Sequence, residues 1–281
     1  MSKEGIIPIP KIGTNVLKKI IKLAKKSLLM TIHESDYSTT IYIGGYTKYC
    51  IEAQIMKPLS KQDITVGAFN KIRFDVECSL EHDFTRGYDT TMILKLLLTY
   101  VHTMYPEVQR MSFNDMSHRT CDDGNDIPLS EMMYVLTGKT WYEKHFEAYL
   151  GEDSLKEFIK KEEVFNKQKK EIPWKLMLDS MKNSILPKDE SEFKNIYETS
   201  ETWRDFFNGL FHKLEGITEF CNFVAPWLHT FLTRYFRFQF TSAHYFIPVK
   251  DWNISYTISE YQEGGKRFTR KSRKKQMKDY R

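Results

Sequence analysis

In the run KIRFDVECSL, at positions 71–80, every second residue is apolar. Side chains of a β-strand point alternately to the two faces of a sheet. The alternation therefore places one apolar face against a core and one charged face toward water. The run predicts a sheet strand that is buried on one face.

Segments on both sides of this run supply further strands and helices. Short runs rich in β-branched and aromatic residues predict strands, and apolar residues at a 3.6-residue period predict helices. The order predicts an α+β domain over residues 36–150, with a mixed, mostly antiparallel sheet and flanking helices. The predicted elements are strands at 39–46, 49–56 and 71–80, a helix at 90–105, a strand at 108–113 and a helix at 129–146 that breaks at Gly138.

The N-terminal part, residues 1–35, contains an apolar pattern with lysines between the apolar positions. The spacing predicts a basic amphipathic helix over 14–28. Such a helix packs on its own domain, lies on an anionic membrane or fills the groove of a partner. Packing on its own domain is the interpretation that the pattern favours.

The C-terminal half differs in composition from the first half. Residues 151–170 are rich in Lys, Glu and Gln, which predicts an exposed charged helix at a domain boundary. Ten Trp and Phe residues at mostly helical spacing then predict a mainly helical subdomain over 151–263. We expect the aromatic segment 203–240 to offer contacts to a protein partner.

Residues 264–281 predict a disordered basic tail, released by Gly264 and Gly265. The chain holds 42 basic and 37 acidic residues; without the nine basic and one acidic residues at 266–281, 33 and 36 remain, so the body is slightly acidic. Such a tail binds polyanions by counterion release, and nucleic acid is the partner we expect. A nuclear-localisation signal, a lipid-binding patch and simple solubilisation remain as alternatives. The expected nucleic-acid-binding residues are Lys266, Arg267, Arg270, Lys271, Arg273, Lys274, Lys275, Lys278 and Arg281.

Four cysteines stand far apart with no CxxC pair, which predicts reduced thiols and no zinc site. Lysines interrupt the apolar residues near the start, so no secretory signal is predicted. The longest apolar run elsewhere, 217–232, falls short of the roughly 20 clean residues that a bilayer span needs. These observations predict a cytosolic protein without a transmembrane span.

Three other local patterns predict ordinary structure in place of a site. Gly138-Lys139-Thr140 lacks the glycine that a phosphate-binding loop carries earlier, so a helix break at Gly138 is favoured. The acidic run 122–126 does not have calcium-loop spacing and predicts a solvated loop, with no metal bound. Cys121 with His118 lacks an orienting third group for nucleophilic catalysis.

The order of elements, together with Trp141-Tyr142-Glu143-Lys144-His145-Phe146, resembles the core of the GNAT acetyltransferase superfamily. The sequence 141–146 looks like the YEK-G-F ending of many such enzymes, with His145 in place of the glycine. The resemblance implies acetyl-coenzyme A as cofactor and a pyrophosphate loop before the helix at 90–105. Backbone N–H groups in such a loop point at phosphate oxygens. The residues implied for cofactor binding are Arg86, Gly87, Tyr88, Asp89 and Thr90, and those implied for catalysis are Glu77, Glu81 and Tyr142.

The candidate loop departs from the family pattern at two positions. Phe84 stands where the family has Arg or Gln, and Asp89 stands where it has a second Gly or Ala. A carboxylate beside a pyrophosphate adds like-charge repulsion. The sequence therefore predicts no bound cofactor and a core that acts in binding or scaffolding. An active N-acetyltransferase is the first alternative.

A second resemblance covers the whole chain. Stretches such as Asn114-Asp115-Met116-Ser117 and Gly264-Gly265-Lys266-Arg267 look like those of uncharacterised proteins of large nucleocytoplasmic DNA viruses. The resemblance implies a viral accessory protein in the host cytoplasm or viral factory. A structural component of the virion is the second alternative.

Overall fold

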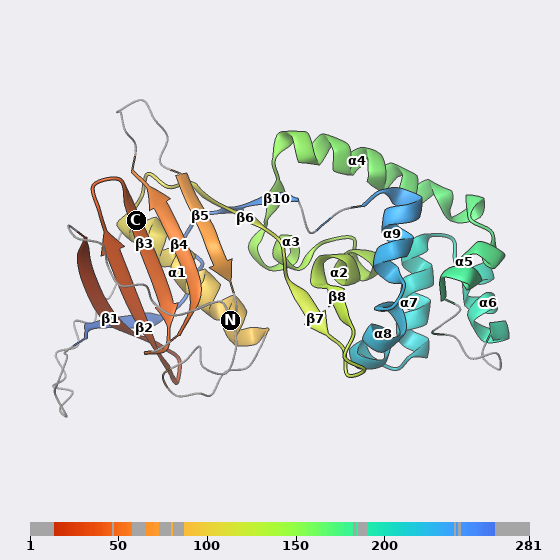
Figure 1. Ribbon diagram of the computed structural model, residues 1–281, viewed down its shortest axis with the longest axis horizontal. Coiled ribbons are helices and arrows are strands. Elements are labelled where there is room, and N and C mark those ends of the chain that lie inside the picture. The colour runs from red at the N-terminus through yellow and green to blue at the C-terminus, as the bar shows by residue number, and fades with distance from the viewer. Residues whose placement is uncertain are drawn as a thin grey trace. The chain divides into compact units, whose positions relative to one another are not determined.

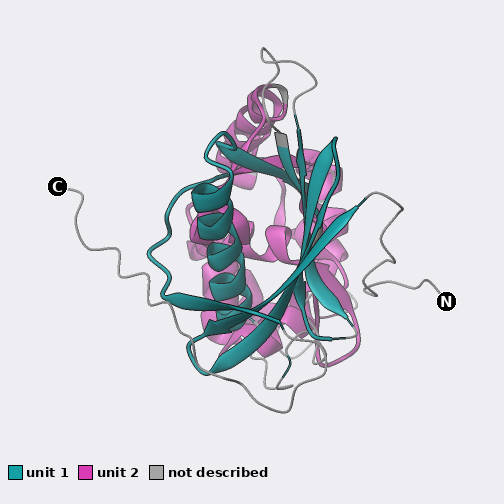
Figure 2. Ribbon diagram, turned by 90° about the vertical axis from the view of Figure 1, so that its left-hand side faces the viewer, with its two compact units in different colours: residues 1–113, 248–281 teal, residues 114–247 magenta. Residues whose placement is uncertain are grey.

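The computed structural model describes residues 14–46, 48–57, 66–72, 80, 87–181, 184, 190–238, 240 and 243–261. Contacts divide the chain into two units: residues 1–113 with 248–281, and residues 114–247. Figure 1 shows the elements of both units, and Figure 2 colours the units separately. The division falls at 113, not at the expected 150, because the helices that follow residue 128 pack into the second core.

The first unit is built on a sheet in which β11, β1, β2, β3, β4 and β5 pair antiparallel in that order. The next pairing, β5 with β6, is parallel, and Gly67 lies opposite Met111 in its register. The sheet is therefore mixed and mostly antiparallel, and the protein is α+β as predicted. The strands are β1 (Asn15–Leu23), β2 (Lys26–Glu34), β3 (Ser38–Gly44), β4 (Tyr49–Met56), β5 (Val66–Ile72), β6 (Arg110–Asn114) and β11 (Tyr256–Glu260).

The predicted N-terminal helix is wrong, because residues 15–34 form the hairpin of β1 and β2. Its turn lies at Ala24, which has a φ of 53°. Neighbouring Ile20 and Ile21 are 3% and 0% exposed, so both faces of β1 are covered at its centre. A strand covered on both faces carries no alternation, and its apolar run is easily taken for a helix.

Helix α1 (Tyr88–Met104) lies along one face of this sheet, as Figure 2 shows. Its side chains Ile93, Leu97 and Val101 are at most 1% exposed. They recur at a helical spacing, which is why the sequence pattern predicted this helix within two residues at each end. The connection from β5 through α1 to β6 joins two parallel strands, as such crossovers do.

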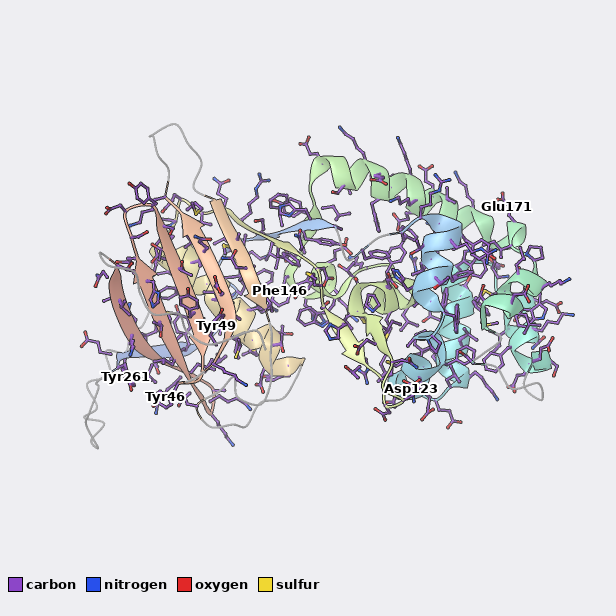
Figure 3. All side chains as sticks on the ribbon, viewed as in Figure 1. Tyr46, Tyr49, Asp123, Phe146, Glu171 and Tyr261 are labelled. Atoms are coloured by element: carbon purple, nitrogen blue, oxygen red, sulfur yellow. A yellow bond between two sulfur atoms is a disulfide. The ribbon has the colours of Figure 1, made fainter. Side chains whose placement is uncertain are left out.

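The predicted strands at 39–46 and 49–56 are confirmed as β3 and β4. Of the run at 71–80, only the first two residues lie in β5, and residues 73–79 lie outside the described part of the chain. Tyr46 follows β3, and its ring centroid lies 6.0 Å from that of Tyr261, which follows β11 (Figure 3).

The second unit is mainly helical around an aromatic core. The helix predicted at 129–146 does break at Gly138, whose φ of 74° ends the first of two helices. The charged helix predicted at 151–170 is confirmed as α4. The elements are β7 (His118–Thr120), β8 (Asp126–Pro128), α2 (Leu129–Thr137), α3 (Trp141–Phe146), β9 (Tyr149–Leu150), α4 (Glu152–Lys167), a 3-10 turn (Gln168–Glu171), α5 (Trp174–Met181), α6 (Glu190–Thr199), α7 (Trp203–Lys213), α8 (Ile217–Val224), α9 (Leu228–Phe236) and β10 (His244–Pro248).

The aromatic side chains of segment 203–240 build this core. Trp203 contacts the rings of Phe206, Phe231 and Phe236 at centroid distances of 5.1–6.0 Å. All four side chains are at most 2% exposed. These four rings are therefore part of the core, and the protein partner expected at segment 203–240 stays a prediction.

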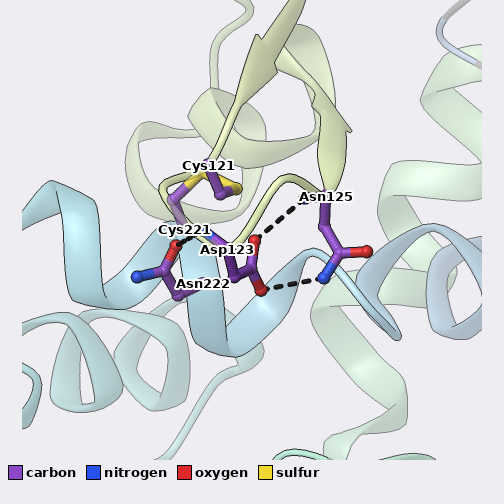
Figure 4. Close-up of a disulfide and its surroundings, with 5 residues drawn as sticks. All are labelled: Cys121, Asp123, Asn125, Cys221 and Asn222. Atoms are coloured by element: carbon purple, nitrogen blue, oxygen red, sulfur yellow. Dashed lines mark hydrogen bonds between the residues drawn. A yellow bond between two sulfur atoms is a disulfide. The ribbon is translucent and has the colours of Figure 1, made fainter.

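The expectation of reduced thiols is wrong for the second unit. A disulfide joins Cys121, in the β7–β8 hairpin, to Cys221 in α8 across 100 residues (Figure 4). Cys50 in β4 is also disulfide-bonded. Bonded Cys121 has no thiol to act as a nucleophile with His118.

Candidate functional site

The N-terminus of α1 is where the sequence placed a phosphate-binding loop. Gly87 is its N-cap, with a φ of 85° that favours glycine. The Gly87 carbonyl accepts hydrogen bonds from the backbone N–H and the hydroxyl of Thr91, at 3.1 and 2.8 Å. A Cβ atom at Gly87 would meet no atom within 4 Å. Helix α1 therefore starts at a glycine with a positive φ, and the side on which a Cβ would lie is open.

A carboxylate of the protein already lies in this first helical turn. Asp89 is 6% exposed, and an oxygen of its carboxylate lies 3.1 Å from Nζ of Lys26 in β2. Counting side-chain atoms alone, Asp89 is 9% exposed and Lys26 is 18% exposed, so the ion pair is largely shielded from water. A negative charge in the first turn also interacts favourably with the helix dipole. The Asp89 carboxylate thus already places at the helix start the negative charge that a bound phosphate would bring there.

Four of the five residues implied for cofactor binding lie at the start of α1. Gly87, Tyr88, Asp89 and Thr90 lie in consecutive positions at the start of α1, and the Tyr88 side chain is 68% exposed. Arg86, Glu77 and Glu81 lie outside the described residues. Tyr142, the third residue implied for catalysis, belongs to α3 in the second unit.

Tyr142 is part of a buried polar group in the second unit. Its side chain is 5% exposed, and burial, with the nearby Asp115 charge adding to it, raises the pKa of its hydroxyl far above the ordinary value. Helix α3 starts at Thr140 with a capping box, in which Glu143 Oε2 accepts from the Thr140 backbone N–H at 2.6 Å. The Tyr142 hydroxyl therefore lies in the interior of the second unit, and the catalytic role that the resemblance implies for it stays a prediction.

Asp115 is the buried acid of this group, with 1% exposure. Its Oδ1 accepts hydrogen bonds from the backbone N–H and the hydroxyl of Ser117, at 2.9 and 2.5 Å. Burial raises the pKa of the carboxyl above its ordinary value, and the two bonds from Ser117 oppose that rise. Local bonding within a single turn is the pattern of a structural Asx turn.

A second buried acid was missed by the sequence analysis. Glu131 in α2 is 0% exposed, and its Oε1 lies 2.7 Å from Nδ1 of His229 in α9. The imidazole is half exposed, while the second carboxylate oxygen, Oε2, is buried without a hydrogen-bond partner. The only local signal is an acid at the start of an apolar helix, and nothing in the sequence connects it to a histidine 98 residues later.

Among the described residues, no three His, Cys, Asp or Glu side chains lie close enough together to hold a metal ion. In the same part of the chain, no helix has both the length and the apolar character of a membrane span. The two buried acids of the second unit, Asp115 and Glu131, bond to different partners, Ser117 and His229. Comparison with protein-family models, curated proteins and solved structures finds no match.

Proposed function

We propose that the chain is a binding or scaffolding protein whose first unit keeps a GNAT-like order of elements without a working cofactor site. Three antiparallel strands, β3 to β5, lead into α1 and a parallel strand, β6. This is the order on which the resemblance rests. It supports the GNAT-like part of the proposal, because the loop before α1 then corresponds to the pyrophosphate loop.

The ion pair between Lys26 and Asp89 carries the non-catalytic part of the proposal. A pyrophosphate at the start of α1 would approach a carboxylate that is 6% exposed and already paired at 3.1 Å. At ~4 Å and an effective dielectric of about 20, each added negative charge costs about 4 kcal/mol against Asp89. Lys26, whose Nζ lies 3.1 Å from the Asp89 carboxylate, attracts the same phosphate and offsets part of this cost. The helix start is therefore better suited to its own side chain than to a cofactor.

Titration of acetyl-coenzyme A into the full chain by calorimetry tests this proposal. We expect no saturable binding and no cofactor-dependent rise in the unfolding temperature. A saturable signal that disappears in Gly87→Asp would instead show cofactor binding at this helix start, as the alternative, an active N-acetyltransferase, requires. A signal that survives Gly87→Asp would come from another site and would not concern this helix start.

An Asp89→Ala variant tests whether the carboxylate is the obstacle. With Asp89 removed and Lys26 kept, we expect inorganic pyrophosphate to bind at least about tenfold more tightly than to the wild type, a gain of about 1.4 kcal/mol. The matched control is Lys26→Met with Asp89→Ala, which removes both charges and should lose that gain. Equal affinity of all three proteins would contradict the assignment of Asp89 as the obstacle.

The basic tail supplies the second part of the proposed role. Its nine Lys and Arg residues within 266–281 lie outside the described residues, and their charge density supports binding of nucleic acid or another polyanion. The slightly acidic body does not compete for the same ligand. Binding through the tail and an inactive core together favour an accessory role over catalysis.

A further inference from the structure

The disulfide of the second unit joins two segments that are distant in sequence and buried in space. Cys121 is 5% exposed and Cys221 is 0% exposed, and both belong to the hydrophobic core of the unit. Their Cα atoms lie 5.6 Å apart, and 100 residues separate them in the chain. The bond thus fastens the β7–β8 hairpin to the middle of α8.

The hairpin loop also reaches α8 through a hydrogen bond to Asn222, which Figure 4 shows together with the bonds inside the loop. The backbone N–H of Asp123 donates to Oδ1 of Asn222 at 3.3 Å. The Asp123 carboxylate accepts from the backbone N–H and the side-chain amide of Asn125, at 3.0 and 2.8 Å. The loop backbone closes with a bond from Cys121 N–H to the Asn125 carbonyl at 2.8 Å. The hydrogen bond to Asn222 thus ties the loop to α8 beside the disulfide, and the other bonds fix the shape of the loop itself.

The hairpin itself is too small to be stable without an anchor. Strands β7 and β8 have three residues each and form a two-stranded sheet. Isolated two-stranded ribbons are marginal in water even when they are longer. Yet this hairpin places Ile127, which is 1% exposed, in the core of the unit. The core therefore depends on a fixed hairpin, and the covalent bond to α8 is its strongest attachment.

We propose that Cys121–Cys221 is a required structural bond and that the chain folds and acts in an oxidising compartment. Disulfides persist in such compartments, whereas the cytosol keeps thiols reduced. Cys50, which lies in the first unit, is also disulfide-bonded, so all the described cysteines of both units are oxidised. This inference differs from the cytosolic location that cysteine spacing led us to expect, and it does not depend on the proposed function.

The bond forms by thiol–disulfide exchange with a disulfide donor, such as an oxidoreductase or oxidised glutathione. The thiolate of one cysteine attacks the donor disulfide and forms a mixed disulfide, releasing one donor thiolate. The thiolate of the other cysteine then attacks the protein sulfur of that mixed disulfide and displaces the second donor thiolate. The two cysteines are oxidised by two electrons, the donor is reduced to its dithiol, and the two cysteine protons end on the donor sulfurs. Because both sulfur atoms become buried, exchange precedes closure of the core.

Refolding of the full chain in two glutathione buffers tests the proposal. Reduced, unfolded chain is refolded at the glutathione ratio of the endoplasmic reticulum or of the cytosol, free thiols are alkylated, and peptides are analysed without reduction. In the oxidising buffer we expect linked peptides containing Cys121 and Cys221. In the cytosolic buffer we expect both cysteines alkylated and an unfolding temperature lower by on the order of 10 °C or more, because neither this 100-residue loop nor the disulfide of Cys50 is then closed.

Alanine variants separate the bond from simple packing. Cys121→Ala, Cys221→Ala and the double variant should all unfold at the same lowered temperature, because losing either sulfur atom loses the bond. Additive losses in the single variants would show a packing role and overturn the proposal. Full formation of the bond in the cytosolic buffer, or equal unfolding temperatures in the two buffers, would overturn the assignment of an oxidising compartment.

Discussion

Glu131 and His229 form a contact in which a fully buried carboxylate meets a half-exposed imidazole, with Oε1 2.7 Å from Nδ1. The two residues lie on α2 and α9, so the contact joins the start of one helix to the first turn of another. Burial raises the pKa of the Glu131 carboxyl above its ordinary value of 4.5, while the hydrogen bond and the charge of His229 oppose that rise. The folded protein therefore holds the Glu131 proton more tightly than the unfolded chain does.

We expect Glu131→Gln to reduce the pH dependence of stability above pH 4.5. A carboxyl whose pKa is raised by folding contributes stability that is fully present below the unfolded pKa and is lost as pH rises through the folded pKa. Glutamine keeps an acceptor for His229 and has no charge to bury, so the variant should gain free energy of unfolding relative to the wild type as pH rises. Urea unfolding at several pH values from 4.5 upward measures this, with the exposed Glu198→Gln as control. Parallel curves for wild type and Glu131→Gln would rule the explanation out.

We expect the Lys26–Asp89 ion pair to show strong coupling in a double-mutant cycle. Lys26→Met leaves the Asp89 carboxylate, 6% exposed, without this cation, and should lower the free energy of unfolding by about 2–4 kcal/mol. Asp89→Leu alone should cost a similar amount, but the double variant should recover most of the loss because two apolar side chains replace a buried pair. Chemical denaturation of the four proteins gives the coupling energy. Purely additive losses would show that the two charges do not depend on each other.

Residue content and helical periodicity predicted several elements correctly. Of the elements found where the sequence placed them, helix α1 follows from periodicity, β3 and β4 follow from their β-branched and aromatic residues, and the break between α2 and α3 follows from Gly138. Periodicity misled where both faces are covered: β1 carries adjacent buried Ile20 and Ile21, and the pattern was taken for a helix. A one-dimensional pattern records the faces of an element, and it does not record how many layers cover that element.

The sequence patterns did not predict contacts between residues that are far apart in the chain. Cys121 and Cys221 are 100 residues apart, and Glu131 and His229 are 98 apart, so no local spacing connects either pair. The candidate anion site was found because its glycine, helix start and acid are contiguous at 87–89. The ion pair between Asp89 and Lys26 was not predicted. Lys26 lies in strand β2, in a segment that was expected to be helical.

Gly138 should be the glycine least tolerant of a side chain among those that end or cap turns in the second unit. Its φ is 74°, and an added Cβ would lie 2.4 Å from Nη2 of Arg204. Gly124 has a similar φ of 84° with nothing within 4 Å of an added Cβ. Gly124→Ala therefore measures backbone strain alone, about 1 kcal/mol, and Gly138→Ala should cost about 1–2 kcal/mol more unless Arg204 moves aside. Equal losses in urea unfolding would show that the guanidinium gives way freely.

Deletion of residues 266–281 should remove most of the salt-dependent affinity for nucleic acid and leave the unfolding temperature unchanged. Each phosphate neutralised by a Lys or Arg adds about 0.9 to the slope of log K against log salt for duplex DNA, so losing nine cations should flatten that slope markedly. Fluorescence anisotropy with a short labelled duplex at several salt concentrations measures both affinity and slope. A tail of shuffled sequence and equal charge should bind as well as the native one, because counterion release does not depend on residue order. Replacing its Lys and Arg with Gln should match the deletion. An unchanged slope in the deleted chain would place the polyanion site on the body instead.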